Sequence, residues 1–264
     1  MIDIGANLAS SSFSNDLDDV LDRAKRAGIE KIIVTGSCFE SNHTSLQLAH
    51  QHRNFLYSTA GLHPHHANQW NKEVEIQIKS LINDELVVAI GEAGLDYNRN
   101  FSEPEQQRRV FTEILEIASK SSKPLFLHQR DAHSDFYGLL RAYQSVCTRS
   151  VVHCFTDTEN SLRAFLDLGC YIGITGWLCD KNRGENLRDI VRYIPLDRLL
   201  IESDAPYLMP HRDKLKRTMA QKNRNEPHTL GHVVKQLAMS LATTDKAIVD
   251  ATTQNAITLF NLND

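Results

Sequence analysis

The chain has 264 residues, of which 41% are hydrophobic and 23% charged, and its formal net charge is -4. This length is too great for a small disulfide-stapled module, and it matches a single α/β barrel of roughly 250 residues. The mean hydropathy is -0.36, and no apolar run approaches the roughly 18 residues of a membrane-spanning helix, so we expect no membrane protein. The net charge disfavours a protein that coats duplex nucleic acid over its whole surface, but it is compatible with a local basic site.

The N-terminus and the cysteines both bear on the cellular compartment. Residues Met1 to Asn7 contain no basic stretch and include Asp3, so we expect no secretory signal. The five cysteines are odd in number and scattered, without a C-x-x-C motif, which favours reduced thiols over a disulfide framework. We therefore expect a cytoplasmic protein, and we expect it to be a monomer without a membrane partner.

Along the chain, short β-branched apolar runs alternate with amphipathic helical patterns. The predicted strands are Ile2–Ile4, Lys31–Thr35, Phe55–Ala60, Leu86–Ile90, Pro124–Leu127, Ser150–Val152, Cys170–Ile174 and Leu199–Ile201. The predicted helices include Asp16–Ala27, Ser45–His52, Glu105–Ser119, Ser161–Leu168, Leu230–Leu241 and Lys246–Leu259. This alternation predicts a parallel sheet, and eight strands close a barrel, so we predict one (β/α)8 TIM-barrel domain over residues 1–264. An open doubly wound sheet is the alternative, but no G-x-G-x-x-G motif follows the first strand.

Polar side chains follow six of the eight predicted strands. In a closed parallel barrel the reactive groups lie at the C-terminal ends of the strands. These positions hold Asn7, His63 and His65, Glu92, His128, His153 and Asp204. A single histidine there is more often a hydrogen-bonded rim residue than a ligand, so it is the convergence of these residues that indicates a site. Cys154 follows His153 directly, and strand alternation points it away from the cavity, into the core.

Three of these residues form a possible metal-ligand set. Glu92, His128 and His153 offer a carboxylate and two imidazoles, which suit Zn, Mn or Fe and leave positions open for water and substrate. A divalent ion there would lower the pKa of a bound water, so that hydroxide is available near neutral pH. Asp204 would accept the proton of that water or bind a second ion. The alternative for Asp204 is a purely structural cap of the turn that begins at Ala205.

The segment from Arg212 to Arg224 is the most charge-biased in the chain, with six basic residues against one acidic residue. It follows the eighth predicted strand, so we expect its positive charge to lie above the cavity and to bind an anionic substrate, phosphate above all. Arg99 and Arg130 follow two other predicted strands and would extend the same field. The alternative interpretation is a solvated loop without a ligand.

The motifs that contain these residues resemble those of the TatD-family metal-dependent deoxyribonucleases, a branch of the amidohydrolase-like barrels. The resemblance covers the whole chain. It rests on Gly61-Leu-His-Pro-His65, Gly91-Glu-Ala-Gly-Leu-Asp96, Leu127-His-Gln-Arg-Asp131, His153-Cys-Phe-Thr156, Gly173-Ile-Thr-Gly176, Ile201-Glu-Ser-Asp-Ala-Pro206 and Arg224-Asn-Glu-Pro227. It implies an amidohydrolase-like TIM barrel and a Mg²⁺- or Mn²⁺-dependent phosphodiesterase. The family's activity is that of a 3′-5′ exonuclease on DNA, with single strands and RNA among its substrates and a role in DNA repair or degradation.

The resemblance also implies roles for single residues. Glu92, His128 and His153 would be metal ligands, Asp204 the catalytic acid at the metal centre, and His63 a catalytic residue that contacts the substrate phosphate. We further assign His65, Arg99, Arg130, Lys214, Lys216, Arg217 and Arg224 to substrate binding.

One departure concerns the number of metal ions. Most of the wider family begins with Asp-x-His-x-His, whose two histidines hold one ion of a pair, but Gly5 and Asn7 occupy those places here. Glycine has no ligand atom, and an amide oxygen is a poorer donor than an imidazole. We therefore expect one firmly bound divalent ion, Mg²⁺ in the first place with Mn²⁺ or Zn²⁺ as alternatives, and a second, weaker one at Asp204.

Two other functions compete with the nuclease. A small-molecule amidohydrolase, deaminase or phosphoesterase could use the same barrel, since fold alone does not decide function. The basic segment, the missing histidine pair and the presence of Glu92 where a carbamylated lysine would stand all argue against it. A non-catalytic nucleic-acid-binding relative is the other alternative, and the retained carboxylate and imidazole set argues against that one.

Overall fold

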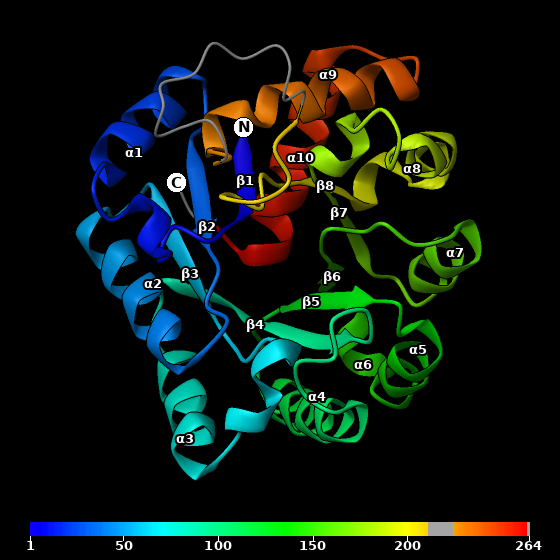
Figure 1. The fold of residues 1–264 in the computed structure, drawn as a ribbon. Coiled ribbons are helices and arrows are strands. Elements are labelled where there is room, and N and C mark those ends of the chain that lie inside the picture. The colour runs from blue at the N-terminus through cyan, green and yellow to red at the C-terminus, as the bar shows by residue number, and fades with distance from the viewer. Residues whose placement is uncertain (211–223, 263–264) are drawn as a thin grey trace.

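The computed structural model describes residues 1–210 and 224–262, and these fold into a parallel barrel (Figure 1). Within these ranges eight strands are hydrogen-bonded in chain order, each parallel to the next. The strands are β1 (Ile2–Ala6), β2 (Lys31–Val34), β3 (Leu56–Ala60), β4 (Val87–Asp96), β5 (Leu125–Arg130), β6 (Ser150–Val152), β7 (Tyr171–Ile174) and β8 (Leu199–Ile201). Almost every strand residue is buried, as expected where helices cover one face of the sheet and side chains fill the other. The predicted TIM barrel is confirmed.

Helices surround the strands in Figure 1. They are α1 (Leu17–Arg26), α2 (Phe39–Gln51), α3 (Lys72–Leu81), α4 (Pro104–Ser119), α5 (His133–Ala142), α6 (Gln144–Cys147), α7 (Glu159–Asp167), α8 (Glu185–Ile190), α9 (Leu230–Ser240) and α10 (Asp245–Phe260). Helix α1 illustrates their amphipathic pattern, because Val20, Leu21 and Ala24 form its buried face. In the described ranges, no helix combines the length and the apolar character that crossing a membrane requires.

Backbone hydrogen bonds join the first and last strands just beyond their C-terminal ends. The amide of Asp204 donates to the carbonyl of Gly5 at 2.9 Å, and the amide of Asn7 donates to the carbonyl of Ala205 at 2.7 Å. Both bonds lie where the loops after the strands begin. They therefore bring Asn7 and Asp204 to the same end of the barrel as the loops after the other strands.

Strand β4 is longer than the predicted Leu86–Ile90 and continues to Asp96. Glu92 consequently lies inside a strand rather than after it. The continuation depends on Gly94, which has a φ of +149° and on which a Cβ would collide with the carbonyl oxygen of His128 on β5. Glycine is the residue that permits both this φ and this close approach of two backbones.

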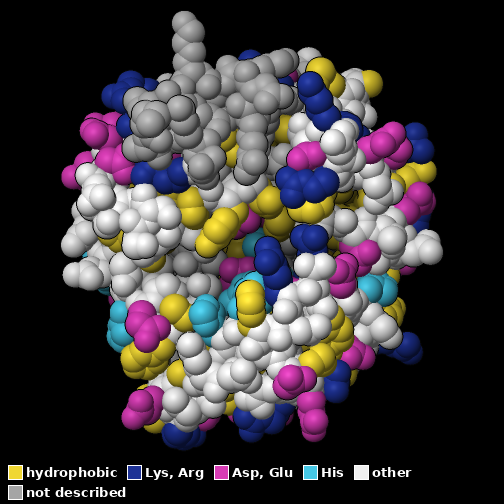
Figure 2. Space-filling view, viewed as in Figure 1, with side chains coloured by type: hydrophobic (Ala, Val, Ile, Leu, Met, Phe, Trp, Pro, Cys, Tyr) yellow, Lys and Arg dark blue, Asp and Glu magenta, His cyan; other side chains and the backbone are white. Residues whose placement is uncertain are grey.

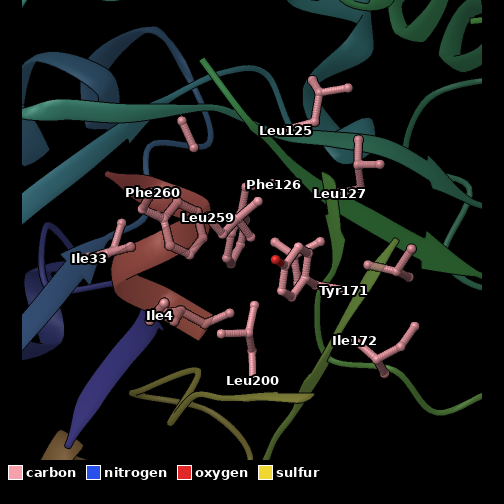
Figure 3. Packing of buried hydrophobic residues seen from close by; sticks show 14 of the residues in the cluster. Ile4, Ile33, Leu125, Phe126, Leu127, Tyr171, Ile172, Leu200, Leu259 and Phe260 are labelled. Carbon is pink, nitrogen blue, oxygen red and sulfur yellow. The ribbon is translucent and has the colours of Figure 1, made fainter. Parts of the chain in front are cut away.

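A hydrophobic layer inside the barrel supports the site from below. Phe126 of β5 is fully buried and packs among aliphatic side chains of other strands, such as Ile4 and Leu200 (Figure 3). The ring centroid of Phe126 lies 4.5 Å from that of His153. The apolar core therefore continues directly into the floor of the polar region.

An ion-pair network ties α1 to the segment that begins at Arg224. Glu226, whose side chain is 1% exposed, accepts hydrogen bonds from Arg23 Nε and Arg224 Nη2, each at 2.7 Å. Arg224 Nη2 also lies 2.7 Å from Asp16 Oδ2. Burial would raise the pKa of Glu226, but hydrogen bonds from His228 and the two arginines lower it from 4.5 to about 2.

Replacing Glu226 by glutamine should destabilise the protein by about 3 kcal/mol at pH 7, because each unit of pKa shift corresponds to about 1.4 kcal/mol. A carboxylate with a lowered folded pKa stabilises fully above its unfolded pKa of 4.5, and this contribution is lost as the pH falls toward the folded value of about 2. The difference between wild type and Glu226→Gln, measured by urea unfolding, should shrink over that range. Glu85→Gln, which removes an exposed ion pair with Arg53, is the control and should change stability much less.

Candidate active site

A cavity of about 420 Å³ opens at the C-terminal ends of the strands. All seven polar residues predicted at strand ends line it: Asn7, His63, His65, Glu92, His128, His153 and Asp204. Figure 2 shows the hollow, with histidine and acidic side chains at its bottom and with hydrophobic and basic side chains around it. The convergence expected from the sequence is therefore present.

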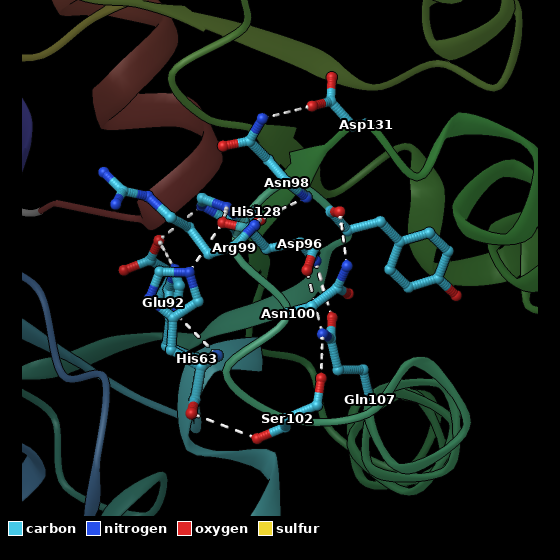
Figure 4. Close-up of polar contacts among 12 residues, drawn as sticks. His63, Glu92, Asp96, Asn98, Arg99, Asn100, Ser102, Gln107, His128 and Asp131 are labelled. Atoms are coloured by element: carbon cyan, nitrogen blue, oxygen red, sulfur yellow. Dashed lines mark hydrogen bonds and ion pairs between the residues drawn. The ribbon is translucent and has the colours of Figure 1, made fainter.

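Glu92 lies at the centre of the cluster, and one of its oxygens faces three imidazoles, of which Figure 4 labels those of His63 and His128. Glu92 Oε1 lies 2.8 Å from His153 Nε2 and 3.0 Å from His128 Nδ1. It lies 3.4 Å from His63 Nε2. Burial would raise the pKa of Glu92, but the surrounding imidazoles of His63, His153 and His128 hold it well below its usual range. Glu92 is therefore a carboxylate, the form that binds a cation.

The spacing of these atoms fits a metal ion. His128 Nδ1 and His153 Nε2 lie 3.4 Å apart, so with Glu92 Oε1 they form a triangle with sides of 2.8, 3.0 and 3.4 Å. Ligand atoms about 2.1 Å from a common ion are roughly 3.0 Å apart along an octahedral edge and roughly 3.4 Å apart in a tetrahedron. The ligand atoms of His63, Glu92 and His128 also lie within 4.8 Å of one another. The described residues thus contain a cluster able to bind a metal.

Glu202 supports His153 from behind, and the sequence analysis missed it. Glu202 Oε2 lies 3.3 Å from His153 Nδ1, while Oε1 accepts the amide of Cys154 at 2.6 Å. The fully buried carboxylate occupies space left by two glycines, since a Cβ on Gly5 or Gly173 would come within 2.5 or 2.7 Å of it. A carboxylate behind a ligating imidazole fixes its tautomer and orientation. The available signal was an acidic residue directly after a buried strand, two positions before Asp204.

Asp96 plays the same part for two other histidines and was also missed. Its Oδ2 lies 2.8 Å from His65 Nε2 and 3.4 Å from His128 Nε2. Burial would raise the pKa of Asp96, but hydrogen bonds from these imidazoles lower it strongly. The signal was strand alternation, because Asp96 lies four residues after Glu92 and so faces the same side of β4.

Asp204 faces the cavity from the loop after β8. Its carboxylate accepts a hydrogen bond from the side-chain amide of Asn7 at 3.2 Å. Burial raises the pKa of Asp204 to about 8, against the lowering influence of His153. The residue has a φ of +52°, a conformation that costs energy outside glycine and is found most often at functional sites.

The prediction that Cys154 points into the core is wrong, because this residue lines the cavity. Strand β6 ends at Val152, and Cys154 has a φ of +46°, so the alternation of an extended strand no longer applies. Burial raises the pKa of its thiol well above the usual value, with Asp204 adding to the effect. Cys154 is therefore a neutral thiol rather than a nucleophilic thiolate.

The predicted basic residues have different environments. Arg99 lines the cavity, and the guanidinium of Arg130 lies 5.1 Å above the Trp177 ring. Within the described ranges, neither arginine has a carboxylate within 4.0 Å. Arg224 instead belongs to the ion-pair network with Asp16 and Glu226, which gives it a structural role. Three of the predicted residues, Lys214, Lys216 and Arg217, lie outside the described residues.

The fold and the cluster define an α/β-barrel enzyme with a cluster able to bind a metal at the C-terminal ends of its strands. A family model described as TatD related DNase matches residues 2–261. The chain belongs to the TatD-related DNase family, as predicted, and its class is that of hydrolases acting on nucleic acid.

Close relatives and solved structures agree with this assignment. The chain is 46% identical to the 3′-5′ ssDNA/RNA exonuclease TatD of Pectobacterium parmentieri over 99% of this chain and 100% of the relative. It is 45% identical to the protein of the same name from Cronobacter sakazakii over 100% and 98% of the two chains. A TatD family hydrolase from Entamoeba histolytica superposes with a TM-score of 0.88 at 29% identity, over 100% and 98% of the chains. A TatD homologue from Escherichia coli also has a TM-score of 0.88, at 30% identity over 99% and 98%.

The close approach between Gly5 and Glu202 makes a prediction about metal binding. In Gly5→Ala the new Cβ would displace the Glu202 carboxylate from His153, although no ligand is removed. The loss of such an orienting partner costs roughly 10- to 100-fold in metal affinity, so we expect the Kd for Mn²⁺ in calorimetric titration to rise by that factor. Gly138→Ala is the matched control, because its Cβ would meet nothing within 4 Å. Equal Kd values for the two variants would contradict the role given to Glu202.

Proposed function

We propose that this protein is a divalent-metal-dependent exonuclease that removes nucleotides from the 3′ ends of single-stranded DNA and RNA. The observation that carries the proposal is the cluster of Glu92 with His128 and His153 at the bottom of an open cavity. The relatives named 3′-5′ ssDNA/RNA exonuclease TatD cover 99% and 100% of this chain at 46% and 45% identity. Mg²⁺ is the ion we expect, with Mn²⁺ or Zn²⁺ as substitutes, since carboxylates and substrate phosphates complete the shell that Mg²⁺ prefers.

The ring nitrogens of the histidines indicate which of them bind the ion. His153 Nδ1 lies 3.3 Å from Glu202 and His128 Nε2 lies 3.4 Å from Asp96, so in each imidazole one nitrogen faces a carboxylate and the other is left to bind a metal. His63 differs, because its Nδ1 accepts the amide of His65 at 3.0 Å. We therefore assign the ion to Glu92, His128 and His153.

His63 is suited to hold the substrate phosphate. Burial lowers its pKa well below 6.5, more than the charge of Glu92 raises it, so the imidazole is neutral. With Nδ1 accepting a backbone amide, the proton must lie on Nε2, which lines the cavity. An N–H at this place can donate to a phosphate oxygen, Arg99 adds positive charge in the cavity, and Arg130 adds it at the C-terminal end of β5.

The reaction is a hydrolysis at phosphorus. A bound divalent ion supplies acidity to water and stabilises the charge that develops on the phosphate. Water attacks phosphorus, the bond from phosphorus to the leaving ribose oxygen breaks, and that oxygen takes a proton from solvent. Asp204 faces the cavity and is held by Asn7, so its ionised carboxylate is positioned to accept the proton that the water loses.

The cellular setting is part of the same proposal. We place the protein in the cytoplasm as a monomer of one domain over residues 1–264, acting in the repair or degradation of DNA. The free thiols of the five cysteines fit a reducing compartment, and all the groups invoked above belong to one chain.

The decisive experiment is digestion of end-labelled substrates by the purified protein. Single-stranded DNA, RNA and duplex DNA, each labelled at the 5′ end, would be incubated with Mg²⁺, with Mn²⁺ or with chelator. A ladder that shortens progressively from the 3′ end of single strands, only when metal is present, supports the proposal. Internal cleavage, or activity unaffected by chelation, would overturn the polarity or the metal dependence respectively.

Removing a ligand should abolish turnover while the barrel stays folded. In Glu92→Ala and His128→Ala we expect kcat/KM to fall by far more than the roughly 100-fold that loss of an orienting partner costs, because no other group replaces the ion. Activity would be measured after chelation and re-addition of metal, with circular dichroism to verify the fold. Glu116→Ala, on the exposed face of α4, is the control. Near-native activity in either variant would show that the ligand assignment is wrong.

Arg130, at the C-terminal end of β5, should contribute mainly to phosphate binding. Arg130→Ala should weaken the binding of a thymidine oligonucleotide and reduce the slope of log K against log salt by roughly 0.7, the contribution of one single-strand phosphate contact. Fluorescence anisotropy in the presence of chelator measures this without hydrolysis. Arg109→Ala, on the exposed side of α4, should leave the slope as it is in the wild type. An unchanged slope in Arg130→Ala would remove Arg130 from the substrate path.

A further inference from the structure

Two aromatic side chains at the cavity are exposed to an unusual degree. Phe101 is 63% exposed and Tyr207 is 59% exposed, and both line the cavity. A large aromatic ring buries well over 100 Å² in a protein interior, so leaving two of them in solvent at one cavity gives up substantial stabilisation. Exposed apolar surface concentrated at one place marks a binding site more often than an accident of packing.

The two rings enter the cavity from opposite sides of the barrel. Phe101 belongs to the loop that follows β4, and Tyr207 to the loop that follows β8. In a barrel of eight strands in chain order, β4 and β8 are diametrically opposed. The Glu92 cluster at the bottom of the cavity therefore lies between them. Hydrophobic side chains border the hollow in Figure 2 on more than one side, in agreement with this placement.

The backbone that carries Phe101 is held in place. Ser102, which is 1% exposed, donates from its hydroxyl to the carbonyl of His65 at 3.2 Å, and its carbonyl accepts Gln107 Nε2 at 2.8 Å (Figure 4). The Phe101 ring itself meets His65 at right angles, with centroids 4.8 Å apart. The ring is therefore presented in one position before any ligand arrives, which lowers the entropy cost of binding.

Tyr207 is anchored through its own backbone and through its neighbour. Its amide donates to the carbonyl of Asp204 at 2.8 Å, and the carbonyl of Pro206 accepts the amide of Asn225 at 2.9 Å. Asn225 is buried and also donates from its side chain to the carbonyl of Ser203 at 2.8 Å. Tyr207 is thus tied to the same short segment that positions Asp204.

We propose that Phe101 and Tyr207 form a base clamp, in which each ring stacks on one unpaired nucleobase on either side of the phosphate to be hydrolysed. The inference rests on the proposed function and names the part of the substrate that the site recognises. Alternation of charge supports this occupant, because Arg99 lies two residues before Phe101 and lines the same cavity. A nucleic acid strand combines anionic phosphates with flat apolar bases, and this cavity combines the guanidinium of Arg99 with two exposed aromatic rings.

The clamp accounts for a preference for single strands without reading their sequence. Bases of a duplex are paired and stacked on each other, so their faces are closed to protein rings except at frayed ends. Every base has a π-face, and stacking on aromatic side chains is accordingly tolerant of sequence and of the sugar. DNA and RNA strands should therefore both be bound. Duplexes should be excluded, because the clamp needs two adjacent bases that are unpaired and no longer stacked on each other.

Abasic substrates test the clamp. A 5′-labelled thymidine oligonucleotide would be compared with one whose two 3′-terminal residues are tetrahydrofuran abasic sites, which keep the sugar ring and the phosphate but lack the base, with Mg²⁺ present. Base stacking on an aromatic side chain changes affinity by roughly 5- to 100-fold per base. Wild-type kcat/KM should therefore be higher for the normal strand by at least the lower limit, roughly 5-fold. In Phe101→Ala and in Tyr207→Ala this ratio should fall severalfold, whereas Tyr207→Phe, which keeps the ring, should retain it.

Each outcome separates the clamp from the proposed function. Hydrolysis of both strands with equal kcat/KM by the wild type would overturn the clamp and leave the nuclease in place. If the alanine variants lost the same fraction of kcat/KM on both strands, the clamp would also be overturned. The rings would then stabilise their loops, or contact a protein partner, without contacting a base. Hydrolysis of neither strand would overturn the proposed function itself. Met239→Ala, an exposed side chain on α9, is the control and should keep the wild-type ratio.

Discussion

The concentration of buried carboxylates at one end of the barrel is the constraint on which the rest of the site depends. Four are buried, namely Asp3, Glu92, Asp96 and Glu202, and the half-buried Asp204 lies beside them. Desolvation makes such a set costly unless cations or hydrogen bonds compensate it, and burial already raises the pKa of Asp3 to about 7. The imidazoles compensate part of the charge, which is why the pKa of His153 is raised well above its usual value by Glu202 and Glu92 despite its burial. A pocket with this excess of negative charge attracts a divalent cation.

The same carboxylates determine how each imidazole is used, and this explains the absent histidine at position 5. Glu202 must lie directly behind His153, and it does so by filling the space beside Gly5. A side chain at position 5 and the Glu202 carboxylate cannot occupy this space together. Asn7 has no such conflict, and its amide holds Asp204 instead. At the start of the chain, the Glu202 carboxylate therefore occupies the space that a histidine side chain at position 5 would need.

The barrel and most of its cavity residues could be predicted because one rule covers them: polar residues at the C-terminal ends of parallel strands converge. That rule placed Glu92 correctly although β4 continues beyond it. A different rule, strand alternation, failed for Cys154, because the chain leaves the extended conformation there. Helix α2 begins at Phe39 rather than Ser45, because Cys38 and Ser41 form a capping box with a cysteine in it, which sequence patterns do not indicate. Phe101 and Tyr207 could not be distinguished from core aromatics, since exposure is a property of the folded chain.

The hydrogen bonds that join β1 to the end of β8 set the order in which the pocket can form. Asn7 precedes Glu202 and Asp204 by nearly two hundred residues, so a ribosome must complete β8 before β1, which already pairs with β2, gains its second neighbour. An unfinished chain lacks two of the carboxylates around the cluster and the seam that closes the barrel. While the nascent protein is still beside the messenger RNA that encodes it, its pocket is therefore incomplete.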